Sequence, residues 1–192
     1  MSIGYLALVL HAHLPFVRHP ESDFVLEEEW LFEAITETYV PLLTMFEGLK
    51  RDGVDFKMTM SMTPPLSSML RDPLLQERYD VHLTQLEELL EKEIARNEHN
   101  GHIKYLAEYY TQEFAKVRKV WESYGGDLTK GFRKFLESGN LDIMTCGATH
   151  GYLPLMKMYP EAVWSQIEVA CQSHEETFGR RPTGIWLPEC AY

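Results

Sequence analysis

The sequence predicts an α/β protein built on a parallel sheet, and three observations support this fold class. An almost unbroken apolar run from Ile3 to Leu10 is typical of a strand that is buried on both faces. Further segments with strand character are separated by segments with helical periodicity, which indicates βαβ units. The residues that could take part in binding or catalysis follow directly after these strands. Such a pattern is typical of ligand-binding α/β folds.

The first half of the chain contains two of the predicted strands. After the strand Ile3–Leu10, apolar residues recur at helical spacing over Glu28–Leu49, which predicts a helix. Pro41 lies inside this helix and should kink or interrupt it. A second strand is predicted over Phe56–Met62, and the two prolines that follow it end the sheet pairing.

Several helices are predicted before the third strand. Asp72 can cap a helix that opens with Pro73. Two more helices are expected over about 102–124 and 127–138, and each is followed by glycine. Because this stretch is far longer than an ordinary crossover, we interpret residues from about 66 to 140 as a helical insertion between the second and third strands.

The last part of the chain supplies two further strands. The third is predicted over Leu141–Cys146, and a helix from Pro160 to just before Gly179 leads to a fourth over Gly184–Leu187. Strands joined by right-handed crossovers point the same way, so their C-terminal ends share one face. Ligands bind at that face in parallel α/β folds, whether the sheet is open or closed into a barrel.

The amino-acid composition narrows the classes of molecule that the protein could bind. Eighteen basic residues against 29 acidic ones give a formal net charge of −11, which opposes binding to nucleic acid. Three cysteines without CxxC spacing suggest neither a disulfide framework nor a zinc ribbon, so we infer a reducing compartment. The N-terminal apolar run lacks the features of a signal peptide and is too short to span a bilayer. We therefore expect a cytoplasmic protein without a membrane partner.

Particular residues at the strand ends are candidates for function. Spacing by two on a strand points His11 and His13 to the same side. Glu189 follows Pro188 among apolar neighbours, which makes an unpartnered charge costly there. Thr63, Thr149 and His150 also follow strands. The remaining histidines are interpreted as structural: His19, His82, His99, His102 and His174.

Three segments together resemble signature regions of glycoside hydrolase family 57. They are residues 11–15 (HAHLP), 146–154 (CGATHGYLP) and 186–192 (WLPECAY), and they occur in the family's order. The third segment is the most specific, and the resemblance covers essentially the whole chain. Within the family, the second and third segments are most similar to those of 1,4-α-glucan branching enzymes, compared with amylopullulanases or 4-α-glucanotransferases.

The resemblance implies a parallel (β/α)7-type barrel, here incomplete, and retaining chemistry on α-1,4-glucan such as glycogen or amylose, without a metal or organic cofactor. It implies that Glu189 is the catalytic nucleophile, held ionised by hydrogen bonds or a nearby cation. His11, His13 and His150 should surround the sugar that becomes covalently attached. Trp30 resembles an aromatic residue that stacks on glucan, and we also expect Trp186 to contact the substrate.

The family's general acid is an Asp on a later strand, and no Asp of this sequence matches it. We therefore expect residues 1–192 to be the N-terminal part of a catalytic barrel that lacks full activity alone. Branching transfers the glucan chain to a 6-hydroxyl, whereas an amylase transfers it to water and a 4-α-glucanotransferase to another glucan. The residues leave these three reactions open, as they do the oligomeric state.

Two readings outside this chemistry also remain open. The His-x-His pair, His11 and His13, at the end of a first strand also suits a metal-dependent barrel hydrolase or deacetylase. Bound zinc that is lost on His11→Ala, together with the activity, would favour that reading. The absence of a matching acid also permits a non-catalytic glucan-binding piece.

Overall fold

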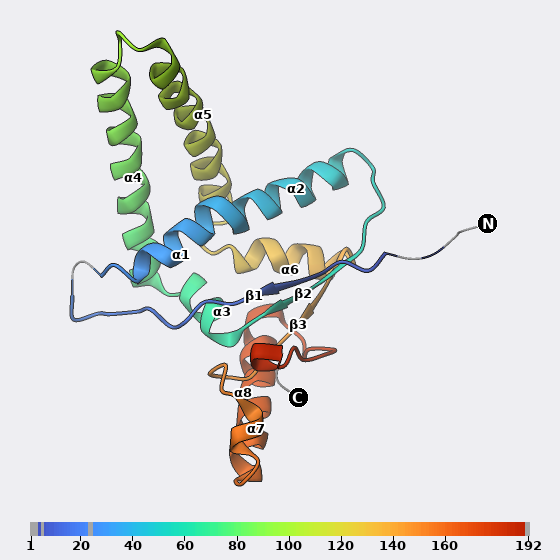
Figure 1. The fold of residues 1–192 in the computed structure, drawn as a ribbon. Coiled ribbons are helices and arrows are strands. Elements are labelled where there is room, and N and C mark those ends of the chain that lie inside the picture. Colours follow the sequence, from blue (N-terminus) through green and yellow to red (C-terminus); the bar gives the residue numbers. More distant parts are fainter. Residues whose placement is uncertain (1–3, 5, 23–24, 191–192) are drawn as a thin grey trace.

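A parallel sheet organises the chain, for which the computed structural model describes residues 4, 6–22 and 25–190. Within these residues, β1 (Val9–Ala12), β2 (Met58–Met62) and β3 (Leu141–Met144) pair in the order β1-β2-β3 (Figure 1). Both pairings are parallel, and the register sets His11 beside Ser61. The predicted α/β class with a parallel sheet is confirmed.

The first strand lies later in the chain than the apolar run Ile3–Leu10 predicts. Its pairing with β2 begins at Val9 and continues to Ala12, so His11 is part of the strand instead of following it. Residues 3 and 5 of the predicted run lie outside the described residues. Hydrophobicity was a poor guide here because partner strand β2 is short and begins only at Met58.

The predicted fourth strand, Gly184–Leu187, is wrong in extent. Only an isolated parallel bridge forms, between Thr145 and Ile185. Two backbone hydrogen bonds accompany it, since the N–H of Thr145 donates to Gly184 and the N–H of Trp186 donates to Thr145. The chain then turns at Pro188, which has no N–H to extend the pairing. The described residues thus hold three strands and one bridge where about four strands were expected.

The predicted helix over Glu28–Leu49 forms with an interruption. It consists of α1 (Glu28–Ala34), a π-helical turn η1 (Ile35–Tyr39) and α2 (Val40–Arg51). In the π-helical turn, the N–H of Val40 donates to a carbonyl five residues earlier. Pro41 follows immediately, where a regular α-helix would bring its ring against a carbonyl. The predicted interruption at Pro41 is therefore confirmed, and its form is a widened turn.

Helices fill the fully described stretch between β2 and β3. They are α3 (Pro64–Leu70), α4 (Pro73–Arg96), α5 (Gly101–Ser123) and α6 (Thr129–Glu137). Asp72 caps α4 as predicted, because its Oδ1 accepts from the N–H groups of Leu74 at 3.0 Å and Leu75 at 3.1 Å. Helices α4 and α5 form a long hairpin that projects from the sheet (Figure 1).

The segment after β3 contains α7 (Leu153–Met156), α8 (Pro160–Phe178) and the 3₁₀ turn η2 (Pro188–Cys190). Helix α8 ends at Gly179, whose φ of 78° is left-handed and suits glycine. His174 ties α8 to β3, because its Nε2 lies 2.9 Å from the carbonyl oxygen of Ile143. This buried residue behaves as the structural histidine that the sequence predicts.

The hydrophobic core lies between the sheet and the helices beside it. Its largest fully buried side chains include Met60 of β2, Phe46 of α2 and Phe132 of α6. Burying one such side chain contributes about 1.5–3 kcal/mol. Neighbouring strand residues point to opposite faces, so Met60 faces the core and Ser61 faces the other side. The core therefore fixes the strands from the face opposite His11.

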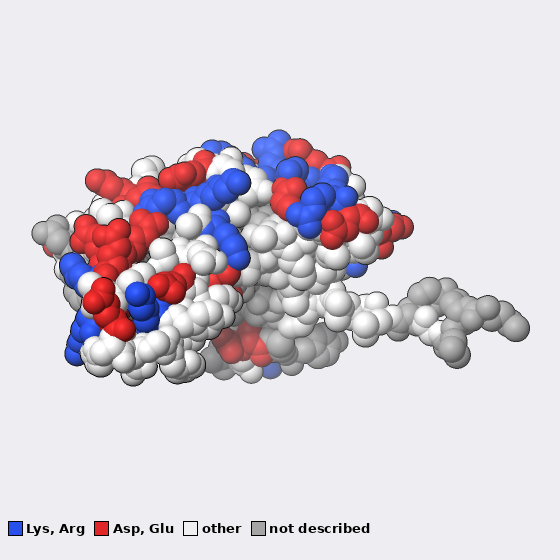
Figure 2. Space-filling view, turned by 90° about the horizontal axis from the view of Figure 1, so that it is seen from above, with Lys and Arg blue, Asp and Glu red and all other residues white. Residues whose placement is uncertain are grey.

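The surface carries charges of both signs. Figure 2 shows acidic and basic side chains interspersed on one face, without a broad basic area among the described residues seen there. This agrees with the net charge of −11. No helix of the described residues is long and apolar enough to cross a membrane.

Candidate active site

Side chains from three segments meet beyond the C-terminal ends of the strands. They line a cavity of about 320 Å³, and its lining residues are His11, His13, His150, Trp186 and Glu189. The first two come from β1 and the residue after it, His150 follows β3, and the last two follow the bridge to β3. The parallel sheet brings them together because each segment leaves the sheet at the same edge.

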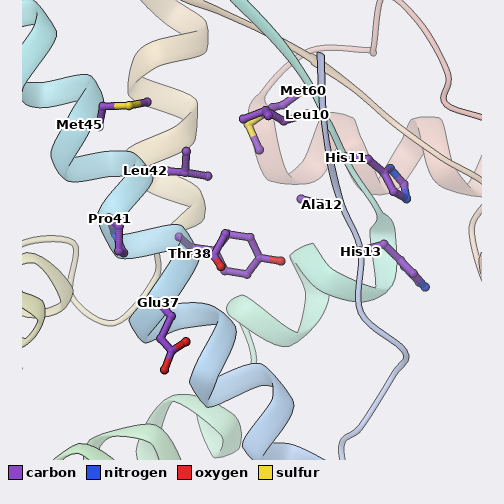
Figure 3. Close-up of a pocket in the computed structure, with 11 residues that line it drawn as sticks. Leu10, His11, Ala12, His13, Glu37, Thr38, Pro41, Leu42, Met45 and Met60 are labelled. Atoms are coloured by element: carbon purple, nitrogen blue, oxygen red, sulfur yellow. The ribbon is translucent and has the colours of Figure 1, made fainter. Parts of the chain in front are cut away.

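His11 and His13 project from β1 to the same side, away from Leu42 and Met45 of α2 (Figure 3). Each ring is held by a hydroxyl group of the neighbouring strand. His11 Nδ1 lies 2.5 Å from the Oγ of Ser61, and His13 Nδ1 lies 3.1 Å from the Oγ1 of Thr63. Both hydroxyl residues are fully buried, so the two rings have fixed orientations.

The aromatic rings of the cavity are stacked on one another. The ring centroids of His13 and His150 are 3.6 Å apart, with an angle of 10° between their planes. The ring of Trp186 lies 5.3 Å from that of His11, at an angle of 23°. The stacked rings form a continuous wall with apolar faces and polar edges, which is a surface suited to a sugar ring.

A tight turn presents His150. Its N–H donates to the carbonyl of Gly147 at 3.0 Å, and its φ of 56° lies in the left-handed region. Gly147 leaves little room for a side chain, because a Cβ at this position would lie 3.1 Å from Pro188 and 3.3 Å from the Gln166 side chain. Gln166 of α8 in turn bonds both the N–H and the hydroxyl of Thr149, at 2.9 and 2.8 Å. The turn is therefore fixed from α8.

Glu189 also has a left-handed backbone, with φ 54° and ψ 23°. Strained residues of this kind cluster at functional sites. Its Oε1 lies 3.6 Å from the Nε2 of His150, which is longer than a hydrogen bond. The Glu189 side chain is 71% exposed, so the expected apolar enclosure is absent among the described residues. Water, instead of a buried cation, can stabilise the charge of this carboxylate.

The histidines of the cavity favour their neutral forms. Burial, together with the neighbouring His150 and His11, lowers the pKa of His13 to about 4. Burial also lowers the pKa of His11 and of His150, while Glu189 acts in the opposite direction on both. Neutral imidazoles offer one N–H donor and one acceptor each, a combination that suits sugar hydroxyl groups.

We expect the stability of the folded protein to fall as the pH is lowered from 6.5 towards 4. A histidine whose pKa is lowered by folding binds a proton more readily in the unfolded chain, which destabilises the folded state at low pH. The stability that His13 contributes is therefore complete above pH 6.5 and is lost as the pH falls towards its folded pKa of about 4. Urea unfolding at several pH values should show a shallower decline for His13→Asn. His102→Asn, at an exposed position of α5, is the control and should keep the original slope. An unchanged slope in the His13 variant would contradict the lowered pKa.

In the described structure Trp30 does not line this cavity. It lies in α1, its exposed fraction is 49%, and it is not among the five lining residues. Its contact with glucan stays a prediction.

His82, interpreted as structural, lies on α4 with its Nδ1 3.2 Å from Glu29.

Sequence reasoning missed three residues that hold the candidate side chains. Ser61, Cys146 and Gln166 each contact a residue of the cavity or of the turn that presents it. A signal for Ser61 was present, because it stands two residues before Thr63 as His11 stands two before His13. Cys146 opens the segment 146–154 but was not singled out within it, and no local signal marked Gln166. Among the described residues, no group of three or more His, Cys, Asp or Glu side chains is arranged to hold a metal ion.

Comparison with known protein families gives one match. The sequence profile of Glycosyl hydrolase family 57 matches residues 7–192. A curated relative, a 1,4-alpha-glucan branching enzyme from Thermococcus kodakarensis, is 38% identical over 191 residues, covering 98% of this chain and 27% of the relative. A probable 1,4-alpha-glucan branching enzyme from Mycobacterium tuberculosis is 25% identical over 98% of this chain and 38% of its own length.

Solved structures share the fold. The alpha-amylase AmyC from Thermotoga maritima is similar with a TM-score of 0.92 and 49% identity, over 97% of this chain and 35% of that one. A branching enzyme of family 57 type from Pyrococcus horikoshii has a TM-score of 0.92 and 37% identity, over 98% and 35%. The present chain thus spans roughly a quarter to two fifths of the length of these relatives.

Proposed function

The chain belongs to glycosyl hydrolase family 57, and from this premise we propose that it carries the donor-sugar site and the nucleophile of a retaining enzyme acting on α-glucan. We propose 1,4-α-glucan branching as the reaction. The observation that supports this most is the cavity in which one carboxylate, Glu189, faces three neutral imidazoles and an indole. Two branching enzymes among the relatives favour this reaction.

Glu189 is the nucleophile in this proposal. Its carboxylate attacks the anomeric carbon of the donor sugar, the α-1,4 carbon–oxygen bond breaks, and a second carboxyl group protonates the departing oxygen. The two carboxyl groups of retaining glycosidases lie about 5–5.5 Å apart. We assign no residue of the present chain to the second role. The second carboxylate then takes the proton of the 6-hydroxyl of another glucan, and the oxygen of that hydroxyl displaces Glu189 from the anomeric carbon, which restores the free carboxylate.

The other cavity residues bind and orient the donor sugar. The Nδ1 atoms of His11 and His13 are engaged by Ser61 and Thr63, so their Nε2 atoms are available to sugar hydroxyl groups. Trp186, stacked on His11, offers an apolar face to the sugar ring. Hydrogen bonds that strengthen as charge develops on the sugar would stabilise the transition state.

Hydrolysis of α-1,4-glucan is the second candidate reaction. The Thermotoga maritima structure, at 49% identity, is that of an alpha-amylase. The exposure of Glu189 is compatible with water as the acceptor in the described part of the chain. Branching and hydrolysis share the first step and differ in whether water or a glucan hydroxyl reaches the glycosyl–enzyme.

We further propose that residues 1–192 form the N-terminal part of a catalytic barrel of the (β/α)7 type, with the helices of about 66–140 as an insertion. The parallel strands and the TM-scores above 0.9 support this. In this proposal the partner is α-1,4-glucan and the compartment is the cytoplasm. The free thiol of Cys171 is compatible with a reducing compartment.

Product analysis of the full-length protein with amylose tests the reaction. Branching should create α-1,6 linkages, visible by proton NMR, while iodine staining falls and the number of reducing ends stays nearly constant. A rise in reducing ends without new α-1,6 linkages would identify hydrolysis instead. Redistributed chain lengths without either change would identify 4-α-glucan transfer. An unchanged amylose would contradict the proposed function.

A further inference from the structure

His150 is contacted at both edges of its ring by groups of different character. Its Nδ1 lies 3.3 Å from the Sγ of Cys146, which is fully buried at the end of β3. Its Nε2, on the opposite edge, lies 3.6 Å from the carboxylate of Glu189. The His150 side chain itself is only 8% exposed. A buried thiol and an exposed carboxylate therefore act on the same imidazole.

The carboxylate favours one of the two neutral forms of this ring. Burial lowers the pKa of His150, so the ring is neutral near pH 7 and carries its proton on one nitrogen. A nitrogen lone pair directed at the Glu189 carboxylate would be repelled, whereas an N–H there is attracted. The Nε2–H form then leaves Nδ1 as an acceptor that needs a donor inside the protein.

We propose that Cys146 is a positioning residue of the reaction: its S–H donates to Nδ1 of His150 and holds the ring in the Nε2–H form that faces Glu189. This inference rests on the proposed function of Glu189 as the nucleophile. The Nε2–H points to the nearer carboxylate oxygen, 3.6 Å away, and orients it for attack on the sugar. In this proposal Cys146 acts on the reaction through the imidazole that it contacts.

The other two histidines of the cavity are held in the same manner. His13 Nδ1 is 3.1 Å from Thr63 Oγ1, and the same oxygen accepts the N–H of Leu66 at 3.5 Å as the cap of α3. Ser61 likewise contacts Nδ1 of His11. Buried hydroxyl and thiol groups of β2 and of the residues that follow β2 and β3 thus lie against all three Nδ1 atoms, and Cys146 is the one for His150.

A direct test is the protonation state of His150 in the unmodified full-length protein. Histidine labelled with ¹⁵N and long-range proton–nitrogen NMR distinguish Nε2–H from Nδ1–H, and loss of the signals in His150→Gln assigns them. We expect the Nε2–H form near pH 7. In Cys146→Ala the proportion of Nδ1–H should rise. Finding Nδ1–H in the unmodified protein, or an unchanged proportion in the alanine variant, would overturn the proposal.

Turnover of amylose provides the second readout. Cys146→Ala should lower kcat about 5- to 10-fold, the effect expected from one hydrogen bond, with KM nearly unchanged. Cys146→Ser retains a donor and should restore most of kcat. If Cys146 only fills space in the core, the serine variant should be less active than the alanine variant, because a buried hydroxyl in place of the thiol is less favourable than alanine. Serine as impaired as alanine would therefore refute the positioning role.

Further variants distinguish a failure of the proposed function from a failure of the role proposed for Cys146. Cys171→Ser removes a thiol of α8 outside the cavity and should leave kcat unchanged. If Glu189→Gln retained full turnover, the proposed function would fail, whereas the NMR measurement would still decide how Cys146 acts on His150. If Cys146→Ala failed to fold, the NMR spectrum of the unmodified protein and the serine variant would decide.

Discussion

Replacing Glu189 with glutamine should lower the turnover of amylose by the full-length protein by at least about 10³-fold, because an amide cannot form the glycosyl–enzyme bond. Glutamine has nearly the same shape, and the Glu189 side chain is 71% exposed, so folding and glucan binding should be nearly intact. Initial rates from iodine staining and reducing ends give turnover, and calorimetry with a maltooligosaccharide gives affinity.

Azide distinguishes a nucleophile from a general acid at this position. In Glu189→Gly, azide can enter the space left by the carboxylate and attack α-glucosyl fluoride from the same side. The fluoride leaves and a β-glucosyl azide forms, whereas loss of an acid or base would give the α-azide through the intact nucleophile. Glu175→Gln, at an exposed position of α8, is the matched control and should keep full turnover. The α-azide would refute the nucleophile assignment.

His13→Ala should reduce kcat/KM for amylose by about 10²-fold, the effect of removing one preorganised donor from an active site. His13 is part of the stacked wall, since its ring lies 3.6 Å from His150 and its Nδ1 is engaged by Thr63. Its loss removes a sugar contact and the nearer of the two histidine rings that stack on His150. Steady-state kinetics on amylose measure the loss.

Two further variants define what His13 contributes. His13→Asn retains a polar group near the position of Nδ1 but no ring, so it should keep the contact to Thr63 and recover little activity. His102→Ala removes an exposed histidine of α5 and should leave kcat/KM unchanged. A His13→Ala enzyme with less than twofold loss would show that the imidazole wall does not contact the reacting sugar.

Local signals predicted the helices well. Asp72 before Pro73 predicted the start of α4, and Gly125 and Gly179 marked the ends of α5 and α8 within a residue or two. These signals are reliable because capping and left-handed backbone depend on neighbouring residues alone. The interruption at Pro41 was predicted for the same reason, although its π-helical form depends on how α1 and α2 pack.

Signals that depend on distant partners were less informative. The apolar run Ile3–Leu10 indicated a strand, but pairing with the short β2 moved it to Val9–Ala12. The sequence of Gly184–Leu187 suits a strand equally well, yet within it only Ile185 forms a bridge, to Thr145 just after β3. Trp30 also illustrates this. A tryptophan is suited to stacking on a sugar ring, but the position of Trp30 in α1 leaves it outside the cavity lined by His11, His13, His150, Trp186 and Glu189.

By itself, the sequence predicted that the strands run parallel and which side chains follow them, since periodicity and turn residues act over short distances. Only the tertiary structure decided which groups meet. The contact of His11 with Ser61 joins residues 50 positions apart, and Trp186 reaches His11 from the other end of the chain. The packing of Met60 and Phe132 in the core sets the strand register that makes these contacts, and no local preference encodes it.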